Sequence, residues 1–144
     1  MTLAAILKNK GPDVFTVTRG ATLAEVAAGL AARGVGFAVV LGTGNLLEGV
    51  ISERDVIRRL AAHGPMAMAL PVEQVMTRGV ITATPRTTVD QAMALMTAGG
   101  FRHLPVMNKG ELVGVISIRD VVRAKLDMNE TEVECLRAYV ACSA

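Results

Sequence analysis

The fold of this chain is decided by a ten-residue stretch that the sequence contains twice. It is GVISERDVIR at Gly49–Arg58 and GVISIRDVVR at Gly114–Arg123, with eight of the ten positions identical at an offset of 65 residues. The similarity extends upstream at an offset of 66, where a helix-like segment and a strand-like segment also recur. These aligned segments are Thr22–Val40 with Thr88–Val106, and Val14–Val17 with Val80–Ala83. Such a repeat indicates two copies of one supersecondary unit.

Each copy is expected to fold as a β-α-β-β-α unit. Thr22 and Thr88 are of a residue type that caps helix N-termini, and each precedes a segment rich in Ala, Met and Leu that ends near glycine. Apolar runs on either side of a Gly-containing turn then predict a hairpin in each copy. The expected helices are 23–32 and 89–98, with further helices from Glu53 and Ile118, and the expected strands are 14–17, 37–41, 46–51, 81–83, 103–107 and 111–116.

The repeat divides the chain into four parts. A unit of about 60 residues buries too little surface to be stable alone. We therefore expect a mixed α/β (α+β) fold in which the two copies pack their apolar sheet faces about a pseudo-twofold axis, leaving two related clefts. The parts are 1–64 with a short N-terminal helix (2–8) and the first repeat, 65–79 with a linker and one helical turn (72–76), 80–126 with the second repeat core, and 127–144 with a C-terminal helix over 129–141 capped by Asn129 or Thr131.

Composition excludes several classes of function. Hydrophobic residues make up 51% and charged residues 19%, with a net charge of +2, so neither disorder nor a nucleic-acid-binding surface is expected. No apolar run approaches the ~20 residues of a membrane helix. Cys135 and Cys142 would lie too far apart on a helix for a disulfide with each other, which favours a reducing, cytoplasmic location. We find no metal-site spacing and no enzyme motif such as a Walker loop.

The second copy resembles the second half of a CBS domain, the domain named after cystathionine β-synthase. The resemblance rests on Phe101–Val106 (FRHLPV) and Leu112–Val122 (LVGVISIRDVV), and the first copy matches more loosely from Val35–Val40 onward. Val75–Thr77, ahead of the second copy, is also typical of the family. The resemblance covers residues 10–126 and is to free-standing CBS pairs, or Bateman modules, rather than to modules attached to an enzyme.

The resemblance implies a regulatory sensor that is not an enzyme. Such pairs commonly bind AMP, ADP, ATP, NAD or S-adenosylmethionine between the repeats, require no cofactor, and signal energy or redox state to a partner protein. Carried over here, Asp120 would accept hydrogen bonds from ribose hydroxyls, and Ser117 and Arg119 would hold phosphate. One implied site comprises Val14, Phe15, Thr16, Val35, Gly36, Arg102, His103, Leu104, Pro105, Ser117, Arg119 and Asp120, and its mirror comprises Ser52, Arg54, Asp55, Val80, Ile81 and Thr82.

The residue types at these sites suit a nucleotide, but they also suit a helix cap. An ionised carboxylate can accept from both vicinal ribose hydroxyls, and phosphate binds Arg and the free N–H groups of a helix N-terminus. Ser52 with Asp55, like Ser117 with Asp120, has the spacing of an acidic capping box, which stabilises a helix start without any ligand. From the sequence, both interpretations stay open.

Two further expectations concern asymmetry and assembly. Arg102 and His103 occur only in the second copy, where the first copy has Gly36 and Phe37, so the cleft beside the second Ser–Asp pair is expected to bind phosphate better. The alanine-rich helix 23–32 offers a small-residue face for a homodimer. The alternative function is a ligand-free structural module that mediates oligomerisation. Neither a membrane nor a nucleic acid is expected as a partner.

Overall fold

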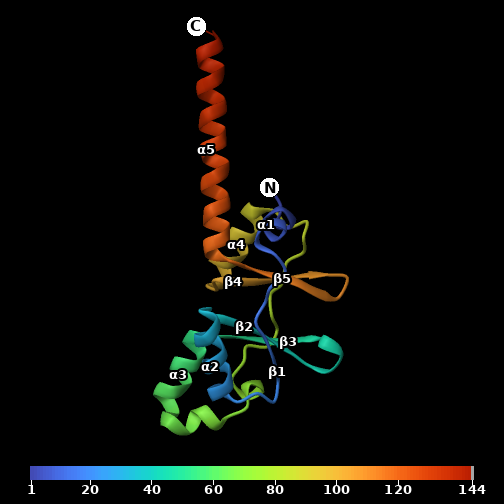
Figure 1. The fold of residues 1–144 in the computed structure, drawn as a ribbon, viewed down its shortest axis with the longest axis vertical. Coiled ribbons are helices and arrows are strands. Elements are labelled where there is room, and N and C mark those ends of the chain that lie inside the picture. Colours follow the sequence, from blue (N-terminus) through green and yellow to red (C-terminus); the bar gives the residue numbers. More distant parts are fainter. Residues whose placement is uncertain (144) are drawn as a thin grey trace.

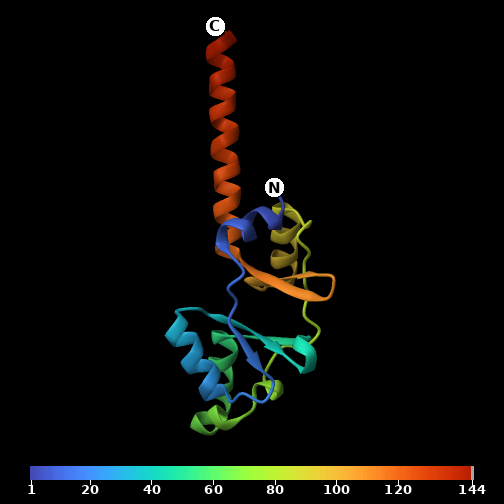
Figure 2. The same ribbon diagram turned by 45° about the vertical axis from the view of Figure 1, so that its right-hand side comes forward.

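The protein folds into two lobes that lie one above the other, with a long helix rising from the upper lobe (Figure 1, Figure 2). The computed structural model describes residues 1–143. The lower lobe comes from the first repeat and the upper lobe from the second, which confirms the mixed α/β class. The lower lobe holds β1 (Thr16–Thr18), α2 (Leu23–Arg33), β2 (Phe37–Leu41), β3 (Leu47–Ser52) and α3 (Glu53–His63), and the upper lobe holds α4 (Val89–Gly99), β4 (His103–Asn108), β5 (Glu111–Ser117) and α5 (Ile118–Ser143).

Both lobes contain a hairpin with the same register. Phe37 of β2 lies opposite Ser52 of β3, and His103 of β4 lies opposite Ser117 of β5. In the lower lobe β1 adds a parallel strand beside β2. A short 3-10 turn, η1 (Thr43–Asn45), connects β2 to β3. The equal register places the two Ser–Asp pairs at equivalent positions in the two lobes.

The expected strand over 81–83 is reduced to a single bridge between Ala83 and Val106. In the lower lobe the N–H of Val39 donates to the carbonyl oxygen of Phe15 at 3.0 Å. The residue equivalent to Val39 in the second copy is Pro105, which has no N–H to donate. The matching hydrogen bond cannot form, and this explains why the strand is shorter than predicted.

The predicted N-caps of the first helix in each repeat are confirmed. The Thr22 side chain accepts from the N–H of Glu25 at 3.2 Å, and the Thr88 side chain accepts from the N–H of Gln91 at 3.1 Å. Glu25 and Gln91 bond back to the cap residues, which completes a capping box in both helices. Each helix ends one residue later than predicted.

Each lobe is completed by the segment that precedes the other lobe. Helix α1 (Leu3–Lys10) comes before the first repeat but packs on the upper lobe, where Leu3 is fully buried and its N–H donates to Thr87. The linker contains η2 (Gly64–Ala69) and η3 (Val72–Gln74), and Val72 is fully buried in the lower core. Residues 1–64, which are contiguous in sequence, are therefore divided between the two lobes.

A glycine makes room for each crossing segment. A Cβ on Gly114 of β5 would overlap the side chain of Leu7, and a Cβ on Gly49 of β3 would overlap Met76 and lie 2.9 Å from the carbonyl oxygen of Thr77. These two glycines open the two copies of the repeated stretch. Close packing against a crossing segment is therefore the reason that the stretch begins with glycine in both copies.

Each lobe has its own hydrophobic core, in addition to the contact between the sheets of the two copies. Side chains alternate along a strand, and the more apolar face of each sheet packs on the helices of its own lobe. The other face meets the opposite lobe, and Val39, fully buried yet in neither core, lies on it. The lower core comprises Leu23, Val26, Leu30, Ala38, Val40, Ile51, Val56, Val72 and Met76, and the upper core comprises Leu3, Ala83, Val89, Ala92, Met96, Leu104, Val106, Ile116, Val121 and Ala124.

The prediction of a separate C-terminal helix is also corrected, because α5 is one continuous helix of 26 residues. Asn129 and Thr131 are residue types that favour caps, but here both lie inside the helix. The Thr131 hydroxyl donates to the carbonyl oxygen of Asp127 at 3.0 Å, a bond that a mid-helix threonine can make without ending the helix. Within residues 1–143, no helix is both long enough and apolar enough to cross a bilayer.

The close approach at Gly49 and Gly114 predicts that alanine at these two positions destabilises the protein to different extents. Gly49→Ala should lower the free energy of unfolding by about 1–3 kcal/mol because the new methyl group overpacks against a backbone carbonyl. Gly114→Ala should cost less, since the end of the Leu7 side chain can move aside. Gly20→Ala is the control, because its Cβ would meet nothing within 4 Å. Urea denaturation measures all three, and equal stability of the Gly49 and Gly20 variants would contradict the packing argument.

Candidate functional site

The two lobes meet at a stacked pair of rings that separates two clefts. The rings of Phe37 and His103 have centroids 4.5 Å apart and planes inclined by 11°. These residues occupy equivalent positions in the two copies, so the stack marks the pseudo-twofold relation between them. Both rings line both clefts. The stack is thus the wall that the clefts share.

Burial favours the neutral form of the His103 ring. Burial first, and then the nearby Lys10 ammonium, lower the pKa of His103 below its ordinary value, against the opposing charges of Asp120 and Glu53. A neutral imidazole avoids burying a charge in the interface between the lobes. His103 is therefore suited to packing and neutral hydrogen bonding, and not to holding a phosphate as a cation at neutral pH.

The first cleft has a volume of about 460 Å³ and lies at the N-terminus of α3. It brings together Ser52, Arg54 and Asp55 from the lower lobe with Val80 and Ile81 from the segment entering the upper lobe, as the sequence predicts. Thr82 lies outside this lining. The cleft is lined by Gly36, Phe37, Val50, Ser52, Glu53, Arg54, Asp55, Arg58, Thr77, Gly79, Val80, Ile81, Gly99, Gly100, Phe101, Arg102, His103 and Pro105.

The second cleft, with a volume of about 810 Å³, lies at the N-terminus of α5. Ser117 and Arg119 line it together with the predicted wall residues Val14, Phe15, Val35 and Gly36, and with Arg102 and His103. Four predicted contacts are not in the lining. Leu104 is fully buried in the upper core, Pro105 lines the first cleft instead, Thr16 lies in β1 opposite Val39, and Asp120 caps α5 by accepting from the N–H of Ser117.

Both clefts have sizes within the roughly 300–1,000 Å³ typical of small-molecule sites. Each also places three cationic side chains beside a helix N-terminus, whose dipole favours an anion such as phosphate. The cations are Arg54, Arg58 and Arg102 in the first cleft, and Lys10, Arg102 and Arg119 in the second.

Arg102 does not distinguish the clefts, because it and His103 line both of them. These two residues therefore give no reason to expect stronger phosphate binding in the second cleft alone. That expectation was based on the position of Arg102 and His103 in the second copy, close in sequence to the second Ser–Asp pair. At the interface between the lobes, however, a residue next to the pseudo-twofold axis is equally near both sides.

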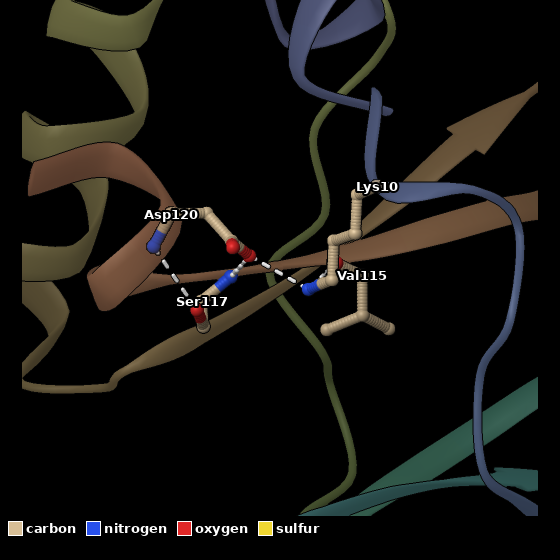
Figure 3. Close-up of polar contacts among 4 residues, drawn as sticks. All are labelled: Lys10, Val115, Ser117 and Asp120. Carbon is tan, nitrogen blue, oxygen red and sulfur yellow. Dashed lines mark hydrogen bonds and ion pairs between the residues drawn. The ribbon is translucent and has the colours of Figure 1, made fainter. Parts of the chain in front are cut away.

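Asp120 is held by a cap and by an ion pair (Figure 3). Its Oδ2 accepts from the N–H of Ser117 at 2.8 Å and from Nζ of Lys10 at 2.6 Å, and its own N–H donates to Ser117 Oγ at 3.2 Å. Lys10 also donates to the carbonyl oxygen of Val115 at 2.9 Å. Burial alone would raise the pKa of Asp120, but the hydrogen bonds from Lys10 and Ser117 hold it below its ordinary value. The Asp120 carboxylate is therefore ionised, and its Oδ2 already accepts hydrogen bonds from Ser117 and Lys10.

Asp55 makes the same cap without an ion pair in the part of the chain that the structure describes. Its Oδ2 accepts from the N–H of Ser52 at 2.8 Å and from Ser52 Oγ at 3.0 Å. The capping interpretation is thus confirmed for both Ser–Asp pairs. It leaves the ligand interpretation open for Asp55, whose carboxylate lines the first cleft, whereas Asp120 is not in the lining of the second.

Several lining residues were not predicted from the sequence, among them Lys10, Phe37, Glu53 and Arg58. Arg58, one turn after Arg54, carried no signal beyond its recurrence as Arg123 in the second copy. Phe37 and Glu53 could have been suspected from their places in the repeat. For Lys10 the sequence offers no signal, because it precedes the repeat and reaches the second cleft only through the crossing of α1.

The sequence of this two-lobed chain matches a known protein family. The CBS domain family model matches residues 10–62 and 72–127. The mitochondrial CBS domain-containing protein CBSX3 of Arabidopsis thaliana is 33% identical over 147 residues, which cover 96% of this chain and 71% of that protein.

Solved structures agree with the family match. The CBS-domain containing protein ATU1752 of Agrobacterium tumefaciens has a TM-score of 0.83 and 37% identity, covering 86% of this chain and 92% of that one. The CBS domain protein PAE2072 of Pyrobaculum aerophilum, solved in complex with AMP, has a TM-score of 0.75 and 35% identity, covering 83% and 89%. The chain therefore belongs to the CBS domain family and carries one CBS domain in each lobe.

Proposed function

We propose that this CBS pair is a regulatory module that binds an adenine nucleotide between its lobes and signals energy or redox state to a partner protein. The observation that carries the proposal is the composition of the first cleft, which combines the Asp55 carboxylate, three cations and a helix N-terminus with apolar walls. The AMP complex of the Pyrobaculum aerophilum relative supports an adenine-containing ligand. AMP, ADP, ATP and NAD all present the same adenosine group, and binding requires no catalytic step.

In the first cleft the parts of a nucleotide have matching protein groups. The ribose hydroxyls would donate to the Asp55 carboxylate in charge-assisted hydrogen bonds. The phosphates would face Arg54 and Arg58, whose guanidinium groups suit phosphate oxygens. The adenine would lie against Val80 and Ile81, which supply an apolar wall.

We propose that the first cleft fills before the second. Asp55 accepts only from its own cap residue Ser52, whereas Asp120 is also paired with Lys10. A ligand that uses the Asp120 carboxylate has to share it with Lys10 or displace that ammonium, which Val115 also holds in place. This cost reverses the order of affinity expected from the sequence.

A ligand-free structural module is the alternative, and one observation favours it: both carboxylates already serve as helix caps. A homodimer is compatible with either function. The exposed side of α2 carries Ala24, Ala28 and Ala31, which would allow a second helix to approach closely. The free, exposed thiols of Cys135 and Cys142 suit the reducing cytoplasm that we propose as the location.

A ligand panel tests the proposed function against the structural alternative. AMP, ADP, ATP, NAD, NADH and S-adenosylmethionine would each be added to the full chain, and thermal unfolding measured. A ligand present at a hundredfold excess over its dissociation constant stabilises the folded state by about 2.7 kcal/mol and raises Tm. Adenosine-free phosphates at the same ionic strength serve as the control. If no member of the panel shifts Tm, the structural alternative is favoured.

Neutralising each carboxylate tests the order of the clefts. Asp55→Asn should weaken binding of the best panel ligand by about tenfold or more, because losing a charged hydrogen-bond partner costs about 1.5–3 kcal/mol. Asp120→Asn should weaken it less at low ligand concentration. Asp90→Asn is the matched control, since Asp90 is also in the first turn of a helix but lies outside both clefts. Calorimetry would contradict the proposed order if Asp120→Asn had the larger effect.

A further inference from the structure

The second half of α5 projects away from the two lobes (Figure 1, Figure 2). Near its start Val121 and Ala124 are buried against the upper lobe, whereas the residues from Asn129 to Cys142 are all exposed. The helix is about 39 Å long at 1.5 Å per residue. A projecting helix of this length is marginally stable in water, because most helices are stabilised by packing of an apolar face.

The projecting helix carries an apolar stripe with a heptad spacing. Five residues, which we call the seam, are Val122, Leu126, Val133, Leu136 and Val140, each between 44% and 65% exposed. With Asn129 included, their spacing alternates between four and three residues, which is the pattern of a two-stranded coiled coil. In heptad notation Leu126, Val133 and Val140 are a positions, and Val122, Asn129 and Leu136 are d positions.

The seam is exposed to a partner helix from Val122, its first residue, onward. Val122 and Leu126 line a shallow hollow on the surface of α5 together with Ile118, Arg119, Arg123, Asp127 and Glu130. Val121 and Ala124, which are buried against the upper lobe, lie on a different side of the helix. A second helix can therefore lie along the whole seam without displacing a residue of the upper core.

Charges beside the seam match when two copies of α5 run in parallel. In that orientation a g residue faces the e residue five positions later on the other helix. Glu132 is a g residue and faces Arg137 of the second copy. Lys125 likewise faces Glu130 of the second copy, and it can share its three N–H donors with Asp90, to which it donates at 2.9 Å. The twofold symmetry repeats both pairs.

An antiparallel arrangement brings like charges together. There g residues face g residues and e residues face e residues. When two antiparallel seams overlap fully, Glu132 faces Glu132 of the second copy and Glu130 faces Glu130. Arg123 faces Arg137 in the same arrangement. Asn129 adds to the preference, since parallel helices in register bring its amide against that of the second copy, where the two amides can hydrogen-bond to each other.

The charges also argue against a membrane surface as the occupant of the seam. The helix beyond the upper lobe has four carboxylates, of Asp127, Glu130, Glu132 and Glu134, against the single guanidinium of Arg137. Interfacial helices that bind anionic membranes have Lys and Arg on their polar face instead.

We propose that α5 forms a parallel two-stranded coiled coil with α5 of a second copy of this chain, in which Glu132 pairs with Arg137 of that copy. The interface is isologous, so the same seam serves both chains. It places the two bodies at the same end of the coil. It does not depend on nucleotide binding, and it is distinct from any contact through α2.

Charge reversal tests the pairing in the full chain. Amide hydrogen exchange of residues 129–141 is the readout, because it reports on α5 even if the bodies also associate. Glu132→Arg and Arg137→Glu alone should each speed exchange by about tenfold, since an attractive pair becomes repulsive at two symmetric places. The double variant Glu132→Arg/Arg137→Glu should restore slow exchange. Glu134→Arg is the matched control, because position 134 faces away from the seam and the change in charge is the same.

A disulfide tests the orientation. In a background with Cys135→Ser and Cys142→Ser, Val140→Cys should form a disulfide-linked dimer on mild oxidation, because parallel helices place position 140 beside its own copy. Antiparallel helices would hold the two sulfurs roughly 27 Å apart at 1.5 Å per residue. The proposal is overturned by the absence of that cross-link. It is also overturned if exchange in α5 is independent of protein concentration, or slows only when anionic vesicles are added.

Discussion

Two short segments hold this CBS pair together, because each lies in the core of the domain that it does not precede. Leu3 is fully buried in the upper lobe, and Val72 is fully buried in the lower lobe. Moving the lobes apart would expose both cores, so the geometry of the clefts is tied to core stability and not to a thin surface contact. Gly49 and Gly114 permit this arrangement by leaving out the side chain at the point of crossing. The packing of the two cores thus determines the width of the clefts.

The same repeated stretch also orients the polar groups of the clefts. After the glycine come a buried isoleucine and then the serine cap, so the strand delivers the helix N-terminus to the edge of the sheet. The cap holds the carboxylate of Asp55 or Asp120 in one orientation before any ligand arrives. Preorganisation of this kind reduces the entropy lost on binding. The capping role of the aspartate is therefore compatible with the proposed contact to a ligand.

Local signals in the sequence predicted most of the fold, and contacts between distant segments accounted for the errors. Thr22 and Thr88 were correctly predicted as caps because a capping box depends only on residues three apart. The shortened strand follows from the missing N–H of Pro105, a local signal that the strand prediction did not weigh. Thr131 was misjudged because its side chain can serve a cap or a mid-helix bond equally well. The role of Lys10 depends on where α1 packs, which no pattern within α1 reveals.

The two domains begin their last helix alike and end it differently, and this difference breaks the symmetry between the clefts. After the Ser52 cap, α3 ends at His63, where Gly64 adopts a φ of 71°. After the Ser117 cap, α5 continues for 26 residues, with no glycine or proline to stop it. Ile118 and Arg119 line both the second cleft and the hollow at the base of the seam. Any molecule in the second cleft therefore touches the helix that leaves the body, whereas a molecule in the first cleft touches a helix that stays within it. The second cleft is therefore the one in direct contact with the helix that leaves the body, beside the ion pair of Lys10 with Asp120.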